Sequence, residues 1–297
     1  MHNPVEIIEV SPRDGIQNEQ TLLSTDDKLA LIQMAIDSGA SRIEVTSFVN
    51  PKRVPQMADA DEVASRLPPN SRSRYIGLAL NKRGYQRACN AALDEANYVV
   101  VASDTFARRN QGTDTEGTLN ILRSLTDDIS NAIPVGVTVA TAFGCPFDGE
   151  VPLTRLMEVV DASMETQPFE IALADTIGVA TPKDVKERVD AVKQRYPDVP
   201  VRLHFHNTRN TGYANAWAGI EAGATALDAS FGGVGGCPFA PRATGNIATE
   251  DLVYMLERAG VDTGVSSAVA IDAAIWLEGK LQKIVPGMVM KAGLFPS

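Results

Sequence analysis

Short β-rich runs alternate with helical patterns along most of the chain, and this alternation limits the possible folds more than any other feature. Eight strands that alternate with helices over roughly 250 residues are typical of a closed (β/α)8 barrel, the TIM barrel. An open, doubly wound parallel sheet shares the local pattern and is the alternative. The β-rich runs lie near Val5–Val10, Arg42–Thr46, Tyr75–Leu80, Tyr98–Ala102, Val135–Ala140, Glu170–Ala174, Arg202–His206 and Ala226–Ser230.

Several helices have clear start and stop signals. Apolar residues at helical spacing predict a helix over Asp27–Ser38, with Thr25 as its N-cap and Gly39 as its stop. Thr181 followed by Pro182 has the order that opens a helix. These signals place helices in the intervals between strands, as both α/β folds require.

No low-complexity linker divides the chain, which predicts one catalytic domain over residues 1–297. The barrel is expected over about residues 5–260 and extra C-terminal helices over about residues 265–297. The helical pattern of Val265–Ile284 could pack across the barrel mouth or make an oligomer contact. Both possibilities stay open at this point.

Charge and cysteine usage narrow the class of protein. A net charge of −10 argues against a nucleic-acid or acidic-membrane partner. No apolar stretch is long enough to span a bilayer, and no secretory signal pattern is present, so we expect a cytoplasmic protein. The three cysteines Cys89, Cys145 and Cys237 show no paired spacing, which indicates thiols in a reducing compartment.

His204 and His206 are the strongest single chemical signal. Side chains two apart in a strand point to the same face, so these imidazoles would aim two nitrogen ligands at one point. That arrangement suits a divalent metal ion. The alternative is a pair of hydrogen-bonded core histidines.

Further polar residues follow the first predicted strand and lie within the second. Arg13 and Asp14 offer a cation for an anionic oxygen and a carboxylate for a metal or a proton, although an ordinary turn with a surface ion pair has the same sequence. Glu44 either lies at the wet rim of the barrel or points inward, and an inward carboxylate needs a partner such as Arg13.

Two more clusters follow later strands. Asp175 after the sixth strand could place a carboxylate in a site or cap the next helix. Cys237 lies in a glycine-rich segment after the eighth strand, where an accessible, reactive thiol is favoured over a small buried one. Because a barrel gathers the C-terminal ends of all its strands, this distribution favours the barrel over the open sheet.

Taken together, these segments resemble the 3-hydroxy-3-methylglutaryl-CoA lyase family. That family is a branch of the metal-dependent barrels that also include the isopropylmalate and homocitrate synthases. The resemblance spans nearly the whole chain and rests on Glu-Val-Ser-Pro-Arg-Asp-Gly-Ile-Gln-Asn-Glu, the His-x-His pair, Gly-Gly-Cys-Pro-Phe-Ala and Thr-Gly-Asn-Ile-Ala-Thr-Glu-Asp-Leu-Val-Tyr-Met-Leu.

The resemblance implies a cofactor and a set of site residues. The cofactor would be Mg²⁺ or Mn²⁺, a homodimer or higher homo-oligomer would be formed, and Gln17 would support the site. The implied metal ligands are Asp14, His204, His206 and Asn246. The implied catalytic residues are Arg13, Asp14, Glu44, Asp175, His204 and Cys237.

The implied reaction is the retro-Claisen cleavage of 3-hydroxy-3-methylglutaryl-CoA, or a close 3-hydroxyacyl-CoA, to acetyl-CoA and a keto acid such as acetoacetate. Asp14 or a histidine would remove the hydroxyl proton, Arg13 would stabilise the enolate oxygen, and Cys237 would return a proton.

Two segments depart from the family pattern. Asn207-Thr208-Arg209 stands where Asp-Thr-Tyr is usual, and Arg242 stands where the family has an uncharged residue. We expect Arg209 and Arg242 to bind substrate together with Arg13 and Gln17. The departures admit citramalyl-CoA, a longer-chain hydroxyglutaryl-CoA or a non-CoA hydroxy keto acid as substrate, and a non-catalytic barrel is the remaining alternative.

Overall fold

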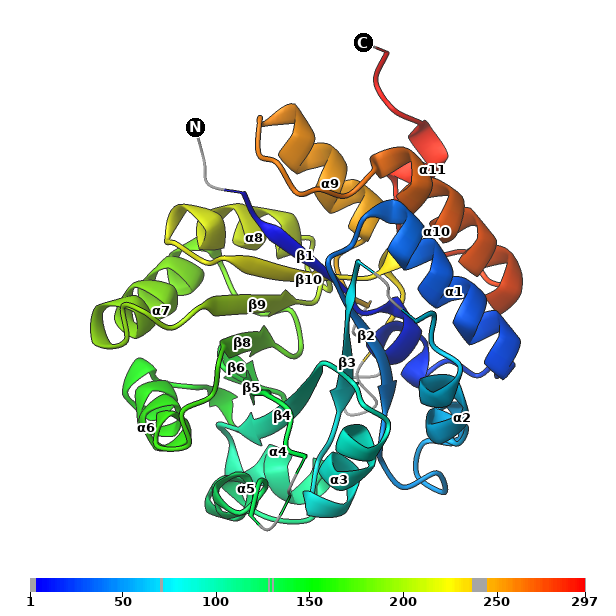
Figure 1. Cartoon of the computed structure of the whole chain (residues 1–297). Helices are drawn as coiled ribbons and strands as arrows, with labels where there is room; N and C mark the ends of the chain where they lie inside the picture. Colours follow the sequence, from blue (N-terminus) through cyan, green and yellow to red (C-terminus); the bar gives the residue numbers. More distant parts are fainter. Residues whose placement is uncertain (1–3, 70–71, 128, 130, 237–244, 297) are drawn as a thin grey trace.

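The strands close into a parallel barrel with helices around it (Figure 1). The computed structural model describes residues 4–69, 72–127, 129, 131–236 and 245–296. Around the barrel the order is β1-β10-β9-β8-β5-β4-β3-β2. The barrel strands are β1 (Glu6–Glu9), β2 (Arg42–Ser47), β3 (Arg74–Leu78), β4 (Glu95–Val101), β5 (Val135–Ala140), β8 (Ile171–Asp175), β9 (Val201–Phe205) and β10 (Ala226–Ala229).

The predicted TIM barrel is therefore confirmed, and each β-rich run became a barrel strand. A short antiparallel hairpin of β6 (Gly144–Cys145) and β7 (Gly149–Glu150) was not predicted. The helices and helical turns are η1 (Ser11–Gly15), α1 (Thr25–Ser38), η2 (Pro55–Met57), α2 (Ala60–Ser65), α3 (Lys82–Asn90), α4 (Asp104–Asn110), α5 (Thr115–Arg123), α6 (Leu153–Met164), α7 (Pro182–Arg195), α8 (Gly212–Glu221), η3 (Phe231–Gly233), α9 (Thr249–Arg258), α10 (Ser267–Leu281) and α11 (Val289–Ala292).

The helix signals are mostly confirmed. Gly39 ends α1 with a φ of 93°, a conformation that glycine adopts without steric cost. The N-cap of α1 is Ser24 rather than the predicted Thr25, because the Ser24 hydroxyl accepts the Asp27 amide hydrogen. Thr181 caps α7 as predicted.

The barrel interior contains a buried network of ion pairs where branched apolar residues usually dominate. Arg42 on β2 donates to both oxygens of Glu170, at 2.8 and 3.0 Å, and also to Glu95 on β4. Since β2 and β8 lie on opposite sides of the ring, the bond to Glu170, the residue just before β8, crosses the barrel. Burial of Arg42 lowers its pKa, but these carboxylates outweigh burial and raise it.

The C-terminal extension packs at the barrel mouth. Buried Val285 lies against Gly232 of η3, and the Gly287 amide donates to the Gly232 carbonyl. The Asp251 carboxylate at the start of α9 accepts from the amides of Met288 and Val289. The residues that follow α10 therefore contact η3 and the start of α9. The two roles left open for Val265–Ile284 stay predictions.

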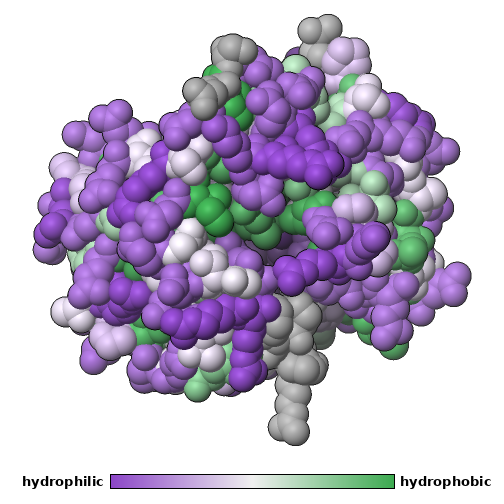
Figure 2. Space-filling view, turned by 90° about the horizontal axis from the view of Figure 1, so that it is seen from below, coloured by the Kyte–Doolittle hydropathy of each residue, from purple (hydrophilic) through white to green (hydrophobic). Residues whose placement is uncertain are grey.

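The surface is largely polar on the face in Figure 2, where hydrophobic side chains form small, separate patches between hydrophilic ones. Among the described residues, no helix has the length and apolar composition needed to cross a membrane.

Candidate metal centre

Asp14, His204 and His206 come together at the C-terminal mouth of the barrel. Asp14 lies in η1, directly after β1, and the histidines lie at the end of β9. Each residue offers one ligand atom, and these atoms all lie within 4.8 Å of one another. The His204 Nε2 atom is 4.0 Å from the Asp14 Oδ2 atom. This separation is longer than a hydrogen bond, which leaves space for an ion shared by both atoms.

Asn246 adjoins the same cluster. Its backbone pairs with that of His206 in an isolated β-bridge, and its Nδ2 donates to Asp14 Oδ2 at 2.9 Å. Two buried acceptors here, His206 Nδ1 and Asn246 Oδ1, have no hydrogen-bond partner among the described residues. A carboxylate, two imidazoles and a carboxamide with unused lone pairs fit Mg²⁺ or Mn²⁺.

The electrostatics of the cluster favour a cation. Burial raises the pKa of the Asp14 carboxyl, but Arg13 and the two histidines outweigh burial and hold the pKa well below its usual range. Burial and the neighbouring His204 lower the pKa of His206 to about 4, so His206 is neutral at neutral pH. Burial lowers the pKa of His204, but Asp228 and Asp14 outweigh it and raise this pKa.

Arg13 is held beside the cluster by two carboxylates. Its Nη1 is 2.7 Å from Asp14 Oδ1, and its Nη2 is 2.5 Å from Glu44 Oε2. Glu44 is fully buried, so it points inward and pairs with Arg13, and the alternative of a wet-rim position is wrong. The surface-turn alternative for Arg13 and Asp14 is also wrong, because Arg13 is buried.

Asp175 holds the turn after β8. Its carboxylate accepts from the amides of Val179 and Ala180, each at 2.9 Å. Since Thr181 caps α7, the alternative that Asp175 caps this helix is wrong. Burial raises the pKa of the Asp175 carboxyl against the effect of these two amide donors.

Other predicted residues lie at the rim or outside the described part of the chain. Arg209 is exposed, and its Nη1 donates to the carbonyls of Ile177 and Gly178 in the loop after β8. Gln17 follows η1, and its buried Oε1 has no hydrogen-bond partner in the described part of the chain. Cys237 and Arg242 lie outside the described residues.

Two of the three cysteines are described, and both are buried free thiols. Cys89 lies on the buried side of α3. Cys145 lies in β6, and its sulfur accepts from the amides of Phe147 and Asp148.

Sequence reasoning missed two buried carboxylates beside the cluster. The Asp228 Oδ2 atom is 3.0 Å from His204 Nδ1. Glu9 accepts from the amides of Ser11 and Phe231. The signal in both cases was an acid at or near the C-terminal end of a short strand with apolar neighbours.

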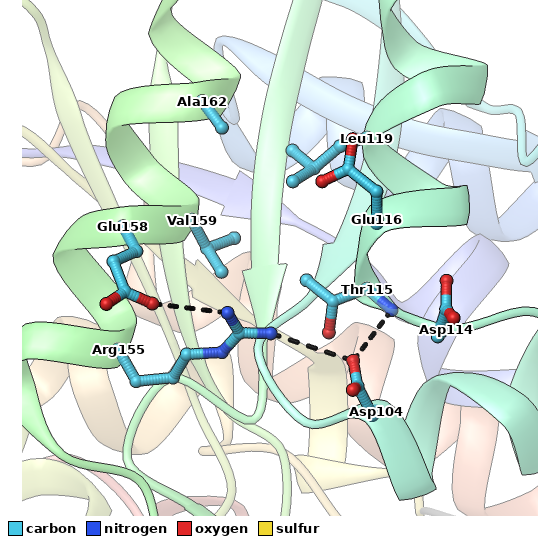
Figure 3. A pocket seen from close by; sticks show the side chains of 9 residues that line it. All are labelled: Asp104, Asp114, Thr115, Glu116, Leu119, Arg155, Glu158, Val159 and Ala162. Atoms are coloured by element: carbon cyan, nitrogen blue, oxygen red, sulfur yellow. Dashed lines mark hydrogen bonds and ion pairs between the residues drawn. The ribbon is translucent and has the colours of Figure 1, made fainter.

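A separate cavity shares no residue with the cluster. It has a volume of about 340 Å³ and lies between α5 and α6 (Figure 3). Arg155 is ion-paired there with both Asp104 and Glu158. This partly neutralised acidic cavity offers no donor set like that at the barrel mouth.

The fold and the cluster define a class: a TIM-barrel protein with donor groups suited to a divalent metal at its C-terminal mouth. The HMGL-like family model matches residues 4–274. The chain therefore belongs to the HMGL-like family.

Similar proteins cover nearly the full length. The chain is 42% identical to the (R)-citramalyl-CoA lyase of Chloroflexus aurantiacus, over 97% of this chain and 95% of that protein. It is 39% identical to the hydroxymethylglutaryl-CoA lyase YngG of Bacillus subtilis, over 95% of each. The structure of an HMG-CoA lyase from Acinetobacter baumannii in complex with coenzyme A and 3-methylmalate superposes with a TM-score of 0.94 at 38% identity, covering 99% of this chain and 98% of that one.

Proposed function

We propose that the protein is a divalent-metal-dependent carbon–carbon lyase that cleaves a carboxylated 3-hydroxyacyl-CoA to acetyl-CoA and a keto acid. The observation that carries the proposal is the convergence of Asp14, His204 and His206 beside the buried cation Arg13. Asn246 completes the ligand set. The CoA ligand of the related Acinetobacter structure supports an acyl-CoA substrate. We also expect a homodimer or a higher homo-oligomer.

The side chains of the cluster have separate roles in proton transfer and in charge stabilisation. A bound Mg²⁺ or Mn²⁺ supplies a Lewis acid that lowers the pKa of the substrate hydroxyl. Asp14 and a histidine of the cluster are the two candidate bases that would remove the hydroxyl proton. The C2–C3 bond then breaks, and its electron pair forms the enolate of the acetyl thioester.

Arg13 and Cys237 complete the reaction. Glu44 and Asp14 hold the Arg13 guanidinium in place, so its charge stabilises the enolate oxygen without reorganising. The Cys237 thiol donates a proton to the enolate carbon and yields acetyl-CoA. Gly232, Gly233 and Gly235, which precede Cys237 in the sequence, have φ values of 68°, 68° and 138°. Glycine adopts these positive φ values without steric cost, so the residues before Cys237 need to be glycines.

The acyl group has two leading candidates. Similarity to both an (R)-citramalyl-CoA lyase and hydroxymethylglutaryl-CoA lyases supports citramalyl-CoA and 3-hydroxy-3-methylglutaryl-CoA. Arg209 and Arg242 are the proposed substrate-binding cations that distinguish this chain, and Gln17 and Arg13 would bind substrate with them. The alternative substrate belongs to a different class: a hydroxy keto acid that carries no CoA.

The proposal is tested by measuring acetyl-CoA release from both acyl-CoA esters, and keto-acid release from free hydroxy keto acids as the comparison. Chelation should abolish release, and added Mn²⁺ should restore it. Cys237→Ala should lower kcat by about 10² or more, since general acid catalysis contributes roughly 10²–10⁴. Cys145→Ala, which removes a thiol held in the β6–β7 hairpin, is the matched control and should keep wild-type kcat. Release that survives complete metal removal, or full activity of Cys237→Ala, would refute the proposal.

A further inference from the structure

Asp228 lies on β10 next to the histidine strand and is almost completely buried. The parallel register pairs Ala226 with Arg202 and Leu227 with Leu203. Continued by one residue, this register brings Asp228 opposite His204. Because side chains alternate along a strand, Arg202 and His204 point to the same side of β9, and Asp228 lies within reach of both.

The Asp228 carboxylate binds both neighbours, one with each oxygen. Its Oδ1 accepts from Arg202 Nε at 2.5 Å, and its Oδ2 is 3.0 Å from His204 Nδ1. An ionised carboxylate has no hydrogen to donate, so the hydrogen between Asp228 and His204 must lie on Nδ1. The other ring nitrogen of His204, Nε2, then carries a free lone pair on the side of Asp14.

We propose that Asp228 is a positioning residue that holds His204 as the Nδ1-protonated tautomer and so presents the Nε2 lone pair to the metal position. This inference rests on the proposed function, because it concerns a ligand of the proposed metal centre. A carboxylate behind a ligating imidazole fixes the tautomer and the ring orientation and makes the ligand more basic.

Arg202, the second partner of Asp228, also belongs to the buried network of ion pairs inside the barrel. Arg202 Nη1 is 3.7 Å from Glu170 Oε1, and Glu170 is bonded to Arg42 across the barrel. Asp228 therefore cannot turn away from His204 without breaking its bond to Arg202. Arg202 thus fixes the orientation of the Asp228 carboxylate, and Asp228 in turn fixes that of the His204 ring.

Asp228→Asn is a sharp test because Arg202 decides how the new amide lies. Arg202 has donors only, so it must face the carbonyl oxygen of Asn. The Asn amino group would then point to His204 Nδ1 and donate to it. His204 would be forced into the Nε2-protonated tautomer, with a hydrogen where the metal should bind.

The experiment measures the tautomer directly in metal-stripped protein with ¹⁵N-labelled histidine, at an alkaline pH where the imidazoles are neutral. The chain has only three histidines, so the variants His2→Ala and His206→Gln assign the His204 signals. We expect Nδ1 protonation in the wild type and Nε2 protonation in Asp228→Asn. Calorimetry should show a Mn²⁺ dissociation constant roughly 10–100-fold higher for Asp228→Asn.

Glu170→Gln is the matched control. It removes a carboxylate from the same buried network, but Glu170 contacts Arg202 and Arg42 rather than His204. This variant should keep the wild-type tautomer and Mn²⁺ affinity even where its melting temperature falls. Such a result separates positioning of the imidazole from a general loss of stability.

Nε2 protonation in the neutral wild type would overturn the inference, and this readout needs no variant to fold. An unchanged tautomer or an unchanged Mn²⁺ affinity in folded Asp228→Asn would also overturn it. If the wild type binds no Mn²⁺, the proposed function fails, whereas the tautomer of the metal-free protein still decides the role of Asp228.

Discussion

At the scale of single residues, Glu9 connects the two segments that carry Asp14 and Asn246. It is fully buried, and its Oε1 accepts from the amide of Ser11, which begins η1, at 2.8 Å. Its Oε2 accepts from the hydroxyl of Thr249, three residues after Asn246, at 2.6 Å. One side chain thus joins the start of η1, which carries Asp14, to the start of α9, which follows Asn246.

Glu9 should make stability depend on pH. Burial raises its pKa from 4.5 to about 7, against the lowering effect of its hydrogen bonds. The folded state binds more protons than the unfolded state between these values, so the stabilisation is present below about pH 4.5 and is lost as the pH rises through about 7. The loss is on the order of 3 kcal/mol.

Urea unfolding of the wild type and Glu9→Gln near pH 5 and near pH 8 measures this effect. The uncharged amide does not titrate, so the wild type should lose more free energy of unfolding than Glu9→Gln over this range. The difference between the two proteins isolates Glu9 from other groups with the same sign, such as Glu250, whose pKa burial raises to about 8. Parallel pH profiles would contradict the assignment.

At the scale of elements, the N-cap of α7 sets where the loop after β8, which belongs to the site, must end. The loop from Asp175 to Ala180 ends where Thr181 begins the cap of α7. The Thr181 hydroxyl and the Asp184 carboxylate satisfy each other's backbone amides, an arrangement known as a capping box. The helix therefore starts at one defined residue, and the loop has a fixed length.

Thr181→Ala should lower the free energy of unfolding by about 1 kcal/mol, because it leaves amide groups of the first turn without their side-chain partner. Thr154→Ala is the control, since Thr154 is an exposed threonine in the first turn of α6. It should change stability by no more than about 0.5 kcal/mol. Denaturant midpoints of the two variants decide this, and equal effects would contradict a role for the cap.

At the scale of the whole molecule, the C-terminal extension and the barrel are packed as one unit at the mouth. A Cβ at Gly287 would lie 2.0 Å from the Glu250 Oε1 atom and 3.3 Å from the Gly232 Cα atom. The end of the chain therefore fits against α9 and η3 only with a residue that has no side chain. Gly287 thus lies close to Gly232, which is more than fifty positions earlier in the sequence.

Two glycine substitutions in the extension should have opposite signs. Gly287→Ala should destabilise the protein by about 1–3 kcal/mol because the added methyl group overpacks a buried contact. Gly279→Ala lies within α10 and meets nothing within 4 Å, so its better helix propensity should stabilise by roughly 0.5–1 kcal/mol. Melting temperatures that move in the same direction would show that the extension does not pack as described.

Much of the fold and part of the site could be predicted from the sequence because their signals are local. The alternation of strands and helices, the Gly39 stop and the Thr181 cap each depend on neighbours along the chain. The start of β4 was misplaced, since Glu95 is a charged residue whose burial depends on Arg42 of another strand. The Ser24 cap was missed for a simpler reason, because adjacent Ser and Thr both suit that position.

By itself, the sequence determined the barrel and the group of residues that meet at its mouth. Parallel strands bring their C-terminal ends to one side, so side chains such as Asp14 and His204 converge wherever they lie in the chain. Only the tertiary structure decided which partner each buried charge received. Asp228 behind His204, Glu9 between two segments and Arg42 opposite Glu170 depend on register and ring closure, which side-chain periodicity along one strand does not encode.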